Sequence, residues 1–300
     1  PHFLLGGGLL FGLGAAIAVA GGAVFDVRLH CLGQAGITCV QLMTHYANDY
    51  FDLAADRANA TPTRFSGGSR VLPSGVLSPR VAVVAAAVLA AAGLVLAVVL
   101  ARAGGRGGPA AAATLIAAQL LAWFYSAPPL RLHSRGLGEI TTALVVTVLT
   151  PLCGFLLQAG GFGAGAPLFP MLGSALMPLV GLQVAMLLAI EFPDAAGDAA
   201  GGKRTLVVLL GGRWAAALLR VLLVVVYGAL PLLAQGALPP LAAAAAALAF
   251  PVALWQFSRL GAGAWGNRDA WEGLAFRGVA LVAVTSAAEL IAFVWLALPR

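Results

Sequence analysis

Charged residues are scarce in this sequence. Asp, Glu, Lys and Arg make up 9% of its 300 residues, whereas a soluble domain carries about 25%. Hydrophobic residues make up 61%, and no soluble fold could bury that much apolar surface. The composition therefore excludes an ordinary soluble domain and indicates a chain that largely faces lipid. Acidic residues number only 11, and six of them lie in two short clusters.

Cysteine and lysine are also rare. The three cysteines, Cys31, Cys39 and Cys153, have no metal-binding or redox spacing, so the sequence predicts neither a zinc site nor a dithiol centre. A single lysine stands against 16 arginines. The net charge of +6 does not imply a nucleic-acid partner, because basic residues in the cytoplasmic loops of a membrane protein give the same surplus. We therefore expect a lipid bilayer and no nucleic acid among the partners.

Apolar runs of about 20 residues, long enough to cross a membrane, recur along the chain. Two long stretches break at a glycine-rich segment and at 235–240, and a more polar run carries Gln, Thr and His. The predicted spans are 3–25, 29–47, 81–101, 109–130, two within 140–190, two within 221–258 with the first starting near Arg213, and 274–298. Helices satisfy their own backbone groups in lipid. We predict one all-α domain over residues 1–300, an integral membrane bundle of nine transmembrane helices around a central cavity.

The basic residues are unevenly distributed between the two predicted sides of the membrane. With nine spans, the loops 48–80, 126–137, 192–213 and 258–277 share one side, and they hold 12 of the 17 basic residues. The side richer in basic residues is expected to be cytoplasmic. Both acidic clusters lie on that side. We therefore predict a multi-pass protein of the cell (inner) membrane whose functional site faces the cytoplasm.

The two acidic clusters repeat one spacing, i, i+3 and i+7, which places three carboxylates on one face of a helix. Their members are Asp49, Asp52 and Asp56 in the first cluster, and Glu191, Asp194 and Asp198 in the second. Like charges on one helical face repel one another, so a cation is expected between them. Oxygen ligands without His or Cys favour Mg²⁺, which typically bridges carboxylates and substrate phosphates. We predict these six residues and Asn48 as Mg²⁺ ligands; one such cluster alone could be a solvated loop end.

These motifs resemble those of a known family. NDYFDLAAD at 48–56 resembles the NDxxDxxxD motif of the UbiA prenyltransferase superfamily, and DAAGD at 194–198 resembles its second motif, DxxxD. The distance between the motifs and the predicted spans are also similar, so the resemblance covers nearly the whole chain. It implies a UbiA-like fold and an Mg²⁺-dependent enzyme that transfers a polyprenyl group from polyprenyl diphosphate to a small aromatic acceptor. The residues that it implies as catalytic are Asp49, Asp52, Asp194, Asp198 and Lys203.

Three basic loops supply candidates for diphosphate binding, since arginine offers planar, always-charged donors. RVLPSG at 70–75 resembles the family's RPLxSG stretch, the loop at 125–139 is similar to the family's loop between spans four and five, and GKRTL at 202–206 resembles the stretch after the second motif. Backbone N–H groups of 66–69 could also bind an anion. The implied diphosphate-binding residues are Asn48, Arg64, Arg70, Tyr125, Arg131, Arg135, Lys203 and Arg204. A lysine common in the second loop is absent here, so which arginine replaces it stays open, and flexible loops carrying positive-inside arginines remain the alternative.

A polar stripe runs along the second predicted span. Its residues recur at steps of four and three, which is one helical face; they are Gln34, Thr38, Gln41, His45, Asn48 and Asp52. In lipid such a face should point inward. We predict that Gln41 and His45, the two nearest the carboxylates, bind the acceptor. Gln34 and Thr38 fit hydrogen bonding between helices equally well.

The predicted reaction leaves the acceptor open. The sequence as a whole resembles most the menaquinone branch, the 1,4-dihydroxy-2-naphthoate polyprenyltransferases, while 4-hydroxybenzoate and homogentisate are alternative acceptors. A cation transporter is an alternative from another class, because paired acids and polar stripes can mark an ion path. Transporter acids usually lie near the bilayer midplane, whereas these acids lie at the ends of spans beside arginine-rich loops.

Overall fold

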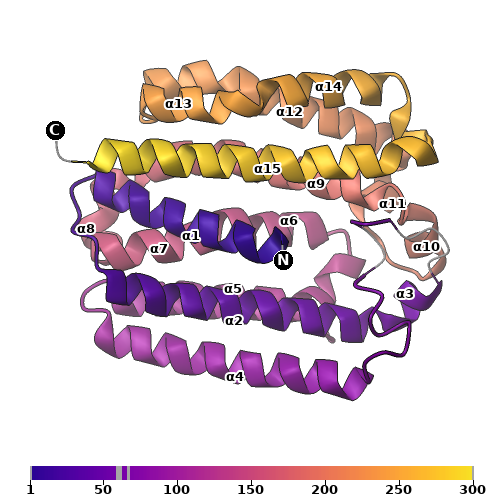
Figure 1. The fold of residues 1–300 in the computed structure, drawn as a ribbon, viewed down its shortest axis with the longest axis horizontal. Coiled ribbons are helices and arrows are strands. Elements are labelled where there is room, and N and C mark those ends of the chain that lie inside the picture. The colour runs from indigo at the N-terminus through magenta and orange to yellow at the C-terminus, as the bar shows by residue number, and fades with distance from the viewer. Residues whose placement is uncertain (1, 59–62, 66–67, 299–300) are drawn as a thin grey trace.

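The computed structural model describes residues 2–58, 63–65 and 68–298. Within these ranges the chain is helical and has no β-strand. Figure 1 shows the long helices running side by side along one direction, with the short helices α3, α10 and α11 gathered at one end. The expected all-α bundle is confirmed.

The first half of the chain forms four long helices and one short helix. They are α1 (His2–Ala20), α2 (Val27–Phe51), α3 (Leu53–Ala58), α4 (Pro79–Ala103) and α5 (Gly108–Ser126). The starts of α2 and α4 follow from local sequence. Asp26 caps α2 by accepting a hydrogen bond from the Leu29 N–H, and Ser78 caps α4 just before Pro79. Acidic or hydroxyl side chains at this position satisfy N–H groups that have no partner within the helix.

The middle of the chain contains two rods separated by glycine. The first comprises α6 (Gly138–Ala143), a π-helical stretch (Leu144–Leu149) and α7 (Thr150–Ala159). The second comprises α8 (Gly161–Gly165), η3 (Ala166–Leu168) and α9 (Phe169–Glu191). Gly160 and Gly161 both adopt positive φ angles between the rods, 76° and 95°, a conformation that glycine accepts at little cost. The predicted break in 140–190 is therefore confirmed.

The last part of the chain returns to the end where α3 lies and then crosses three more times. Its elements are α10 (Ala195–Ala200), α11 (Leu206–Leu210), α12 (Gly212–Gln235), α13 (Pro240–Ala246), η4 (Ala247–Ala249), α14 (Phe250–Gly261), η5 (Ala264–Gly266) and α15 (Arg268–Ala297). The break predicted at 235–240 is the turn between α12 and α13.

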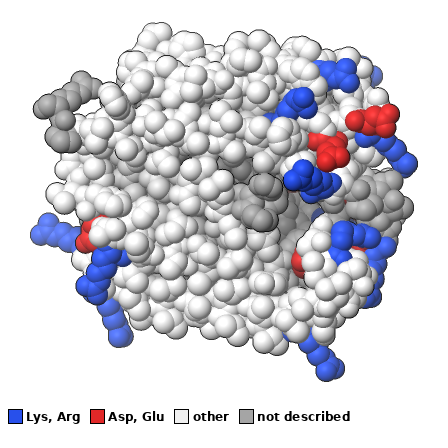
Figure 2. Space-filling model, in the orientation of Figure 1, with Lys and Arg blue, Asp and Glu red and all other residues white. Residues whose placement is uncertain are grey.

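Seven helical segments of the described chain are long and apolar enough to cross a membrane. They are Pro79–Ala103, Gly108–Ser126, Gly138–Ala159, Gly161–Glu191, Gly212–Gln235, Pro240–Gly261 and Arg268–Ala297. The apolar part of α1, Leu4–Ala20, is shorter, and the polar stripe lowers the hydropathy of α2. The count of nine spans remains a prediction. On the face drawn in Figure 2, a band without charged residues separates the two ends, and most charges of this face lie at the end where α3 and α10 are found.

Glycines let the helices approach closely where α1 packs against α7. A Cβ atom on Gly14 would overlap the carbonyl oxygen of Pro151, and one on Gly154 would overlap that of Phe11. Small residues at crossings are typical of helices in membranes, because backbones can then make close van der Waals contact. This contact fixes one wall of the space at the centre of the bundle.

The bundle encloses the expected central cavity. It has a volume of ≈ 810 Å³ and is lined by side chains from α1, α2, α5, α9 and α15 and from the rod that includes α6. One end holds the carboxylates of both acidic clusters, and the depth is lined largely by Leu, Ile and Val. The cavity is therefore polar at its mouth and apolar inside, which suits a molecule with a charged head and an apolar tail.

Candidate active site at the mouth of the cavity

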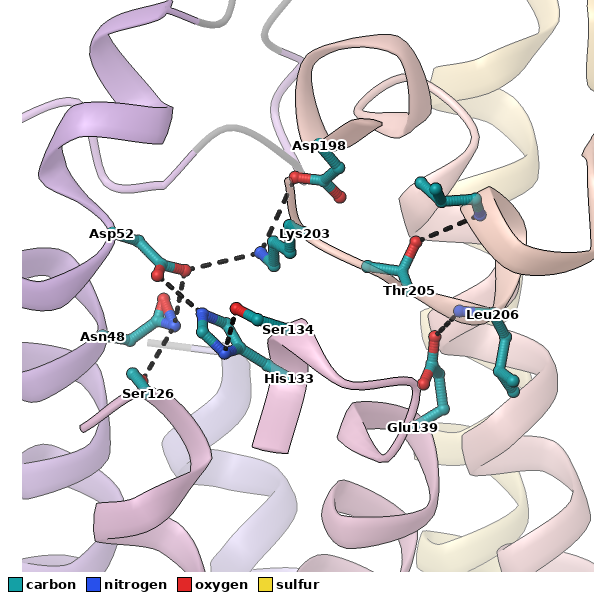
Figure 3. Close-up of polar contacts among 11 residues, drawn as sticks. Asn48, Asp52, Ser126, His133, Ser134, Glu139, Asp198, Lys203, Thr205 and Leu206 are labelled. Atoms are coloured by element: carbon teal, nitrogen blue, oxygen red, sulfur yellow. Dashed lines mark hydrogen bonds and ion pairs between the residues drawn. The ribbon is translucent and has the colours of Figure 1, made fainter. Parts of the chain in front are cut away.

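The two acidic clusters meet at the cavity mouth. The first lies where α2 ends, with Asp52 as the C-cap, and the second lies between the end of α9 and α10. Lys203 Nζ lies 3.4 Å from Asp52 Oδ2 and 3.7 Å from Asp198 Oδ1, so one ammonium group stands between the clusters (Figure 3). The clusters lie on the same side of the molecule, as the sequence predicted.

Asp52 is contacted by several polar side chains (Figure 3). His133 Nε2 lies 2.6 Å from its Oδ1, and both side chains are buried. The Ser134 hydroxyl lies 3.1 Å from His133 Nδ1; when it donates there, Nε2 carries the hydrogen and donates to Asp52. Asn48 Nδ2 lies 3.3 Å from Asp52 Oδ2 and 3.3 Å from the Ser126 hydroxyl. Asp52 is thus held by donors from α2, the second basic loop and Lys203.

The carboxyl groups of this site differ in the direction of their pKa shifts. Burial pushes the pKa of Asp52 upward, but the hydrogen bond from His133 and the charge of Lys203 outweigh it, so this pKa lies below its ordinary value. Burial raises the pKa of Asp56 to about 6, with help from Asp52 and Asp49. Burial likewise raises the pKa of Asp198 to about 6, because the neighbouring Asp194 and Asp52 add to it and Lys203 offsets it only in part.

Lys203 is held as a cation by these acids. Burial alone would lower its pKa, but Asp52 and Asp198 outweigh burial, and the pKa is raised. One ammonium group cannot balance all the carboxylates, as the raised pKa values of Asp56 and Asp198 show.

Carboxylate oxygens carrying excess negative charge are the donors that Mg²⁺ prefers, so the residues present fit this ion in number and type. Within the described residues, no group of three or more His, Cys, Asp or Glu side chains is already gathered as a metal site. The ligand set Asn48, Asp49, Asp52, Asp56, Glu191, Asp194 and Asp198 therefore remains a prediction.

The first basic loop lies over the first cluster. The Ser69 hydroxyl donates to Asp49 Oδ2 at 2.6 Å, and Arg70 Nη1 donates to the carbonyl oxygen of Asp56. Gly68, with φ 72°, packs so closely on Asp56 that a Cβ atom would overlap the carboxylate. Arg64 lines the cavity. The anion-binding role predicted for 66–69 concerns partly Ser66 and Gly67, which lie outside the described residues.

The second basic loop brings a different basic residue into the site than the sequence predicted. Tyr125 lines the cavity as expected, with its ring 5.2 Å from that of His133. Arg131 and Arg135 are exposed and do not line the cavity, and Arg135 donates to the carbonyl of Pro129 at 2.9 Å. Instead η1 (Leu132–Ser134) turns His133 inward. Arg204 in the third loop is also exposed, and its backbone N–H lies 3.3 Å from the Ser134 carbonyl.

Glu139 is a further buried acid near the site that the sequence did not single out. Its Oε1 accepts a hydrogen bond from the Leu206 N–H at 2.5 Å, which ties the second loop to the start of α11 (Figure 3). The carboxyl group of Glu139 also neighbours that of Glu191 at the end of α9. The sequence does contain one indication of its importance: Glu139 is an acid at the end of the second basic loop, directly before an uncharged stretch.

The predicted acceptor residues lie deeper in the cavity. Gln41 and His45 both line it from α2. The Gln41 amide packs on α1 at Gly7, where a Cβ atom would overlap it. Both residues therefore face inward, as expected for the polar stripe, and their binding of the acceptor remains a prediction.

Comparison with known proteins gives one family. The model of the UbiA prenyltransferase family matches residues 9–277. Among curated protein sequences none matches this chain.

Several solved structures share the fold. A UbiA homologue from Aeropyrum pernix K1, in its apo form, has a TM-score of 0.65 at 18% identity and covers 95% of this chain and 94% of its own. A digeranylgeranylglyceryl phosphate synthase has a TM-score of 0.65 at 16% identity, covering 96% and 93%. A UbiA homologue from Archaeoglobus fulgidus, bound to GPP and Mg²⁺, has a TM-score of 0.63 at 15% identity, covering 95% and 96%. At identities of 15–18%, this similarity shows a shared fold alone.

Proposed function

The chain belongs to the UbiA prenyltransferase family, and from this premise we propose that it transfers a polyprenyl group from polyprenyl diphosphate to a small aromatic acceptor. For the acceptor we propose 1,4-dihydroxy-2-naphthoate, which makes the reaction a step of menaquinone biosynthesis. One observation carries the general proposal: two carboxylate clusters face each other across Lys203 at the mouth of a ≈ 810 Å³ cavity whose depth is apolar.

Magnesium is part of the proposal. Two of the solved neighbours are UbiA homologues bound to Mg²⁺ together with DMAPP or GPP. In this chain Asp49, Asp52 and Asp56 would hold the ion from one side and Asp194 and Asp198 from the other. When bound, Mg²⁺ would neutralise the diphosphate and so make it a better leaving group.

The protein's own residues then have distinct roles. Lys203 and Arg70 add positive charge near the diphosphate, where charge develops as it departs. His133 and Asn48 keep Asp52 in place. The apolar depth receives the prenyl chain and excludes water, which would otherwise capture the allylic cation.

In the proposed transfer, one bond breaks for each bond that forms. The allylic C–O bond breaks, and its electron pair leaves with the diphosphate. A carbon of the electron-rich ring supplies the pair for the new C–C bond. The ring then loses a proton or, with dihydroxynaphthoate, its carboxyl group as CO₂.

The test uses purified protein, Mg²⁺, a radiolabelled prenyl diphosphate and a panel of 1,4-dihydroxy-2-naphthoate, 4-hydroxybenzoate and homogentisate. We expect transfer that EDTA abolishes and Mg²⁺ restores. Asp52→Asn and Asp194→Asn should each lose about 100-fold or more, as for other major electrostatic groups. Asp269→Asn, at an exposed acid outside the cavity, is the matched control. Near-normal, metal-independent transfer by the first two variants would overturn the proposed centre, and transfer to another acceptor would replace only the proposed acceptor.

A further inference from the structure

Gln183 is a buried amide on the wall of the cavity formed by α9. Its side chain is 3% exposed and lines the cavity. In the part of the chain that the structure describes, no hydrogen bond to its side chain is found. An amide without a partner in an apolar interior costs free energy. Its position therefore points to a partner that the protein itself does not supply.

Several hydroxyl groups of the cavity wall are satisfied by backbone carbonyls close to them in sequence. The Thr150 hydroxyl donates to the Val145 carbonyl at 2.9 Å, and the Thr44 hydroxyl donates to the Val40 carbonyl at 2.7 Å. These groups need nothing from a ligand. Gln183 differs because glutamine offers two donors and an acceptor on a longer side chain.

Gln183 lies at the same depth as His45 of the polar stripe. Gln183 precedes Glu191 by eight residues on α9, and His45 precedes Asp52 by seven on α2. At 1.5 Å per residue, both lie about 10–12 Å below the acidic mouth. The two residues line one cavity from different helices, α9 and α2. A diphosphate at the mouth would place its reacting carbon between the mouth and this level.

We infer that Gln183 is a specificity-determining residue that hydrogen-bonds a polar substituent of the aromatic acceptor, a hydroxyl or a carboxylate, from α9, while His45 lines the same cavity from α2. This inference rests on the proposed prenyl transfer. The acceptor is the substrate that uses such a group, because a prenyl chain carries no hydrogen-bonding atoms. A site built to hydrogen-bond a substituent also discriminates against analogues that lack it.

The experiment replaces Gln183 by Leu and, as a second apolar variant of similar length, by Met. The KM for the acceptor should rise about 10-fold, which is the size of one hydrogen bond, while the KM for the prenyl diphosphate should change less than about 2-fold. With an acceptor analogue lacking the recognised substituent, the variants and the original protein should perform alike.

Thermal stability provides an independent readout. Because the amide has no protein partner, Gln183→Leu should unfold at the same temperature as the original protein or higher. Lower stability, with equal changes in both KM values, would show a structural amide and overturn the inference. If the unchanged protein transfers no prenyl group to any aromatic acceptor, the proposed function fails instead, whatever the variants do.

Discussion

At the scale of single residues, the pKa values of Asp52 and Asp198 shift in opposite directions, although both side chains contact Lys203. Burial raises the pKa of Asp198 to about 6, and the repulsion that the sequence predicts among the carboxylates adds to it. Burial acts on Asp52 too, but the hydrogen bond from His133 and the charge of Lys203 outweigh it, so the pKa of Asp52 is lowered. When folding raises the pKa of an acid, the protein loses stability as the pH rises from the pKa of the unfolded state to that of the folded state. When folding lowers the pKa of an acid, the acid stabilises the protein at pH values above its pKa in the unfolded state.

Replacing these two acids should therefore have effects of opposite sign in the metal-free protein. At pH 7, Asp198→Asn should raise the Tm by about 2–4 °C, which is what ~1 kcal/mol gives in a large domain, and the gain should vanish below about pH 4, where Asp198 is protonated in both states. Asp52→Asn should lower the Tm at pH 7. This difference in Tm should disappear only at a pH still lower than about 4. Thermal unfolding in detergent with EDTA measures both. Equal shifts of the same sign would contradict the charge balance described for the site.

His133 shows why sequence alone assigned the carboxylates but not their partners. Acids at i, i+3 and i+7 are fixed to one helical face by helix geometry, so their meeting was predictable. The second basic loop instead offers Arg131, His133 and Arg135 in succession. Which of them turns inward depends on a left-handed turn at Arg131, with φ 44°, and on the Asp52 carboxylate that receives His133. No local periodicity encodes that choice. Gln183 could not be predicted for a similar reason, because a single glutamine in an apolar span forms no repeating pattern that would indicate a site.

At the scale of elements, helix breaks were more predictable than helix shape. The breaks near Gly160 and before Pro240 follow from residues that end helices. The π-helical turn at Leu144–Leu149 was not predicted, because the stretch LVVTVL reads as ordinary apolar helix. Its side chains Val145 and Val146 line the cavity, and such turns are frequent at functional sites.

The contact between α1 and α7 gives a prediction for one element pair. Gly14→Ala should destabilise the protein strongly, by about 1–3 kcal/mol or more, because the new methyl group overlaps the Pro151 carbonyl. Gly8→Ala on the same helix is the matched control, since no atom lies within 4 Å of its added Cβ, and it should be neutral or slightly stabilising. Thermal unfolding in detergent compares them. Similar stability for the two variants would mean that α1 does not pack as described.

At the scale of the whole molecule, the charge distribution predicts an orientation. The end of the bundle with both acidic clusters also carries most basic residues (Figure 2), and that end should face the cytoplasm. Cys31, Cys39 and Cys153 would first be replaced by Ala. Ala103→Cys, at the far end of α4, should then react with a membrane-impermeant maleimide on intact spheroplasts. Ala200→Cys, on α10, should react only after permeabilisation. Both residues are exposed, so the reverse pattern would invert the assigned topology.

The contact of Lys203 with both acidic clusters also makes the chain unusually easy to address chemically. Lys203 is the only lysine, so apart from the terminal amine an acylating reagent has one amino group to find, and it lies at the centre of the proposed site. Its raised pKa keeps it protonated and slow to react. Prenyl diphosphate with Mg²⁺ should slow acylation further, whereas Asp52→Asn should speed it by lowering that pKa. Mass spectrometry of the modified peptide would then report occupancy of the cavity mouth without any assay of turnover.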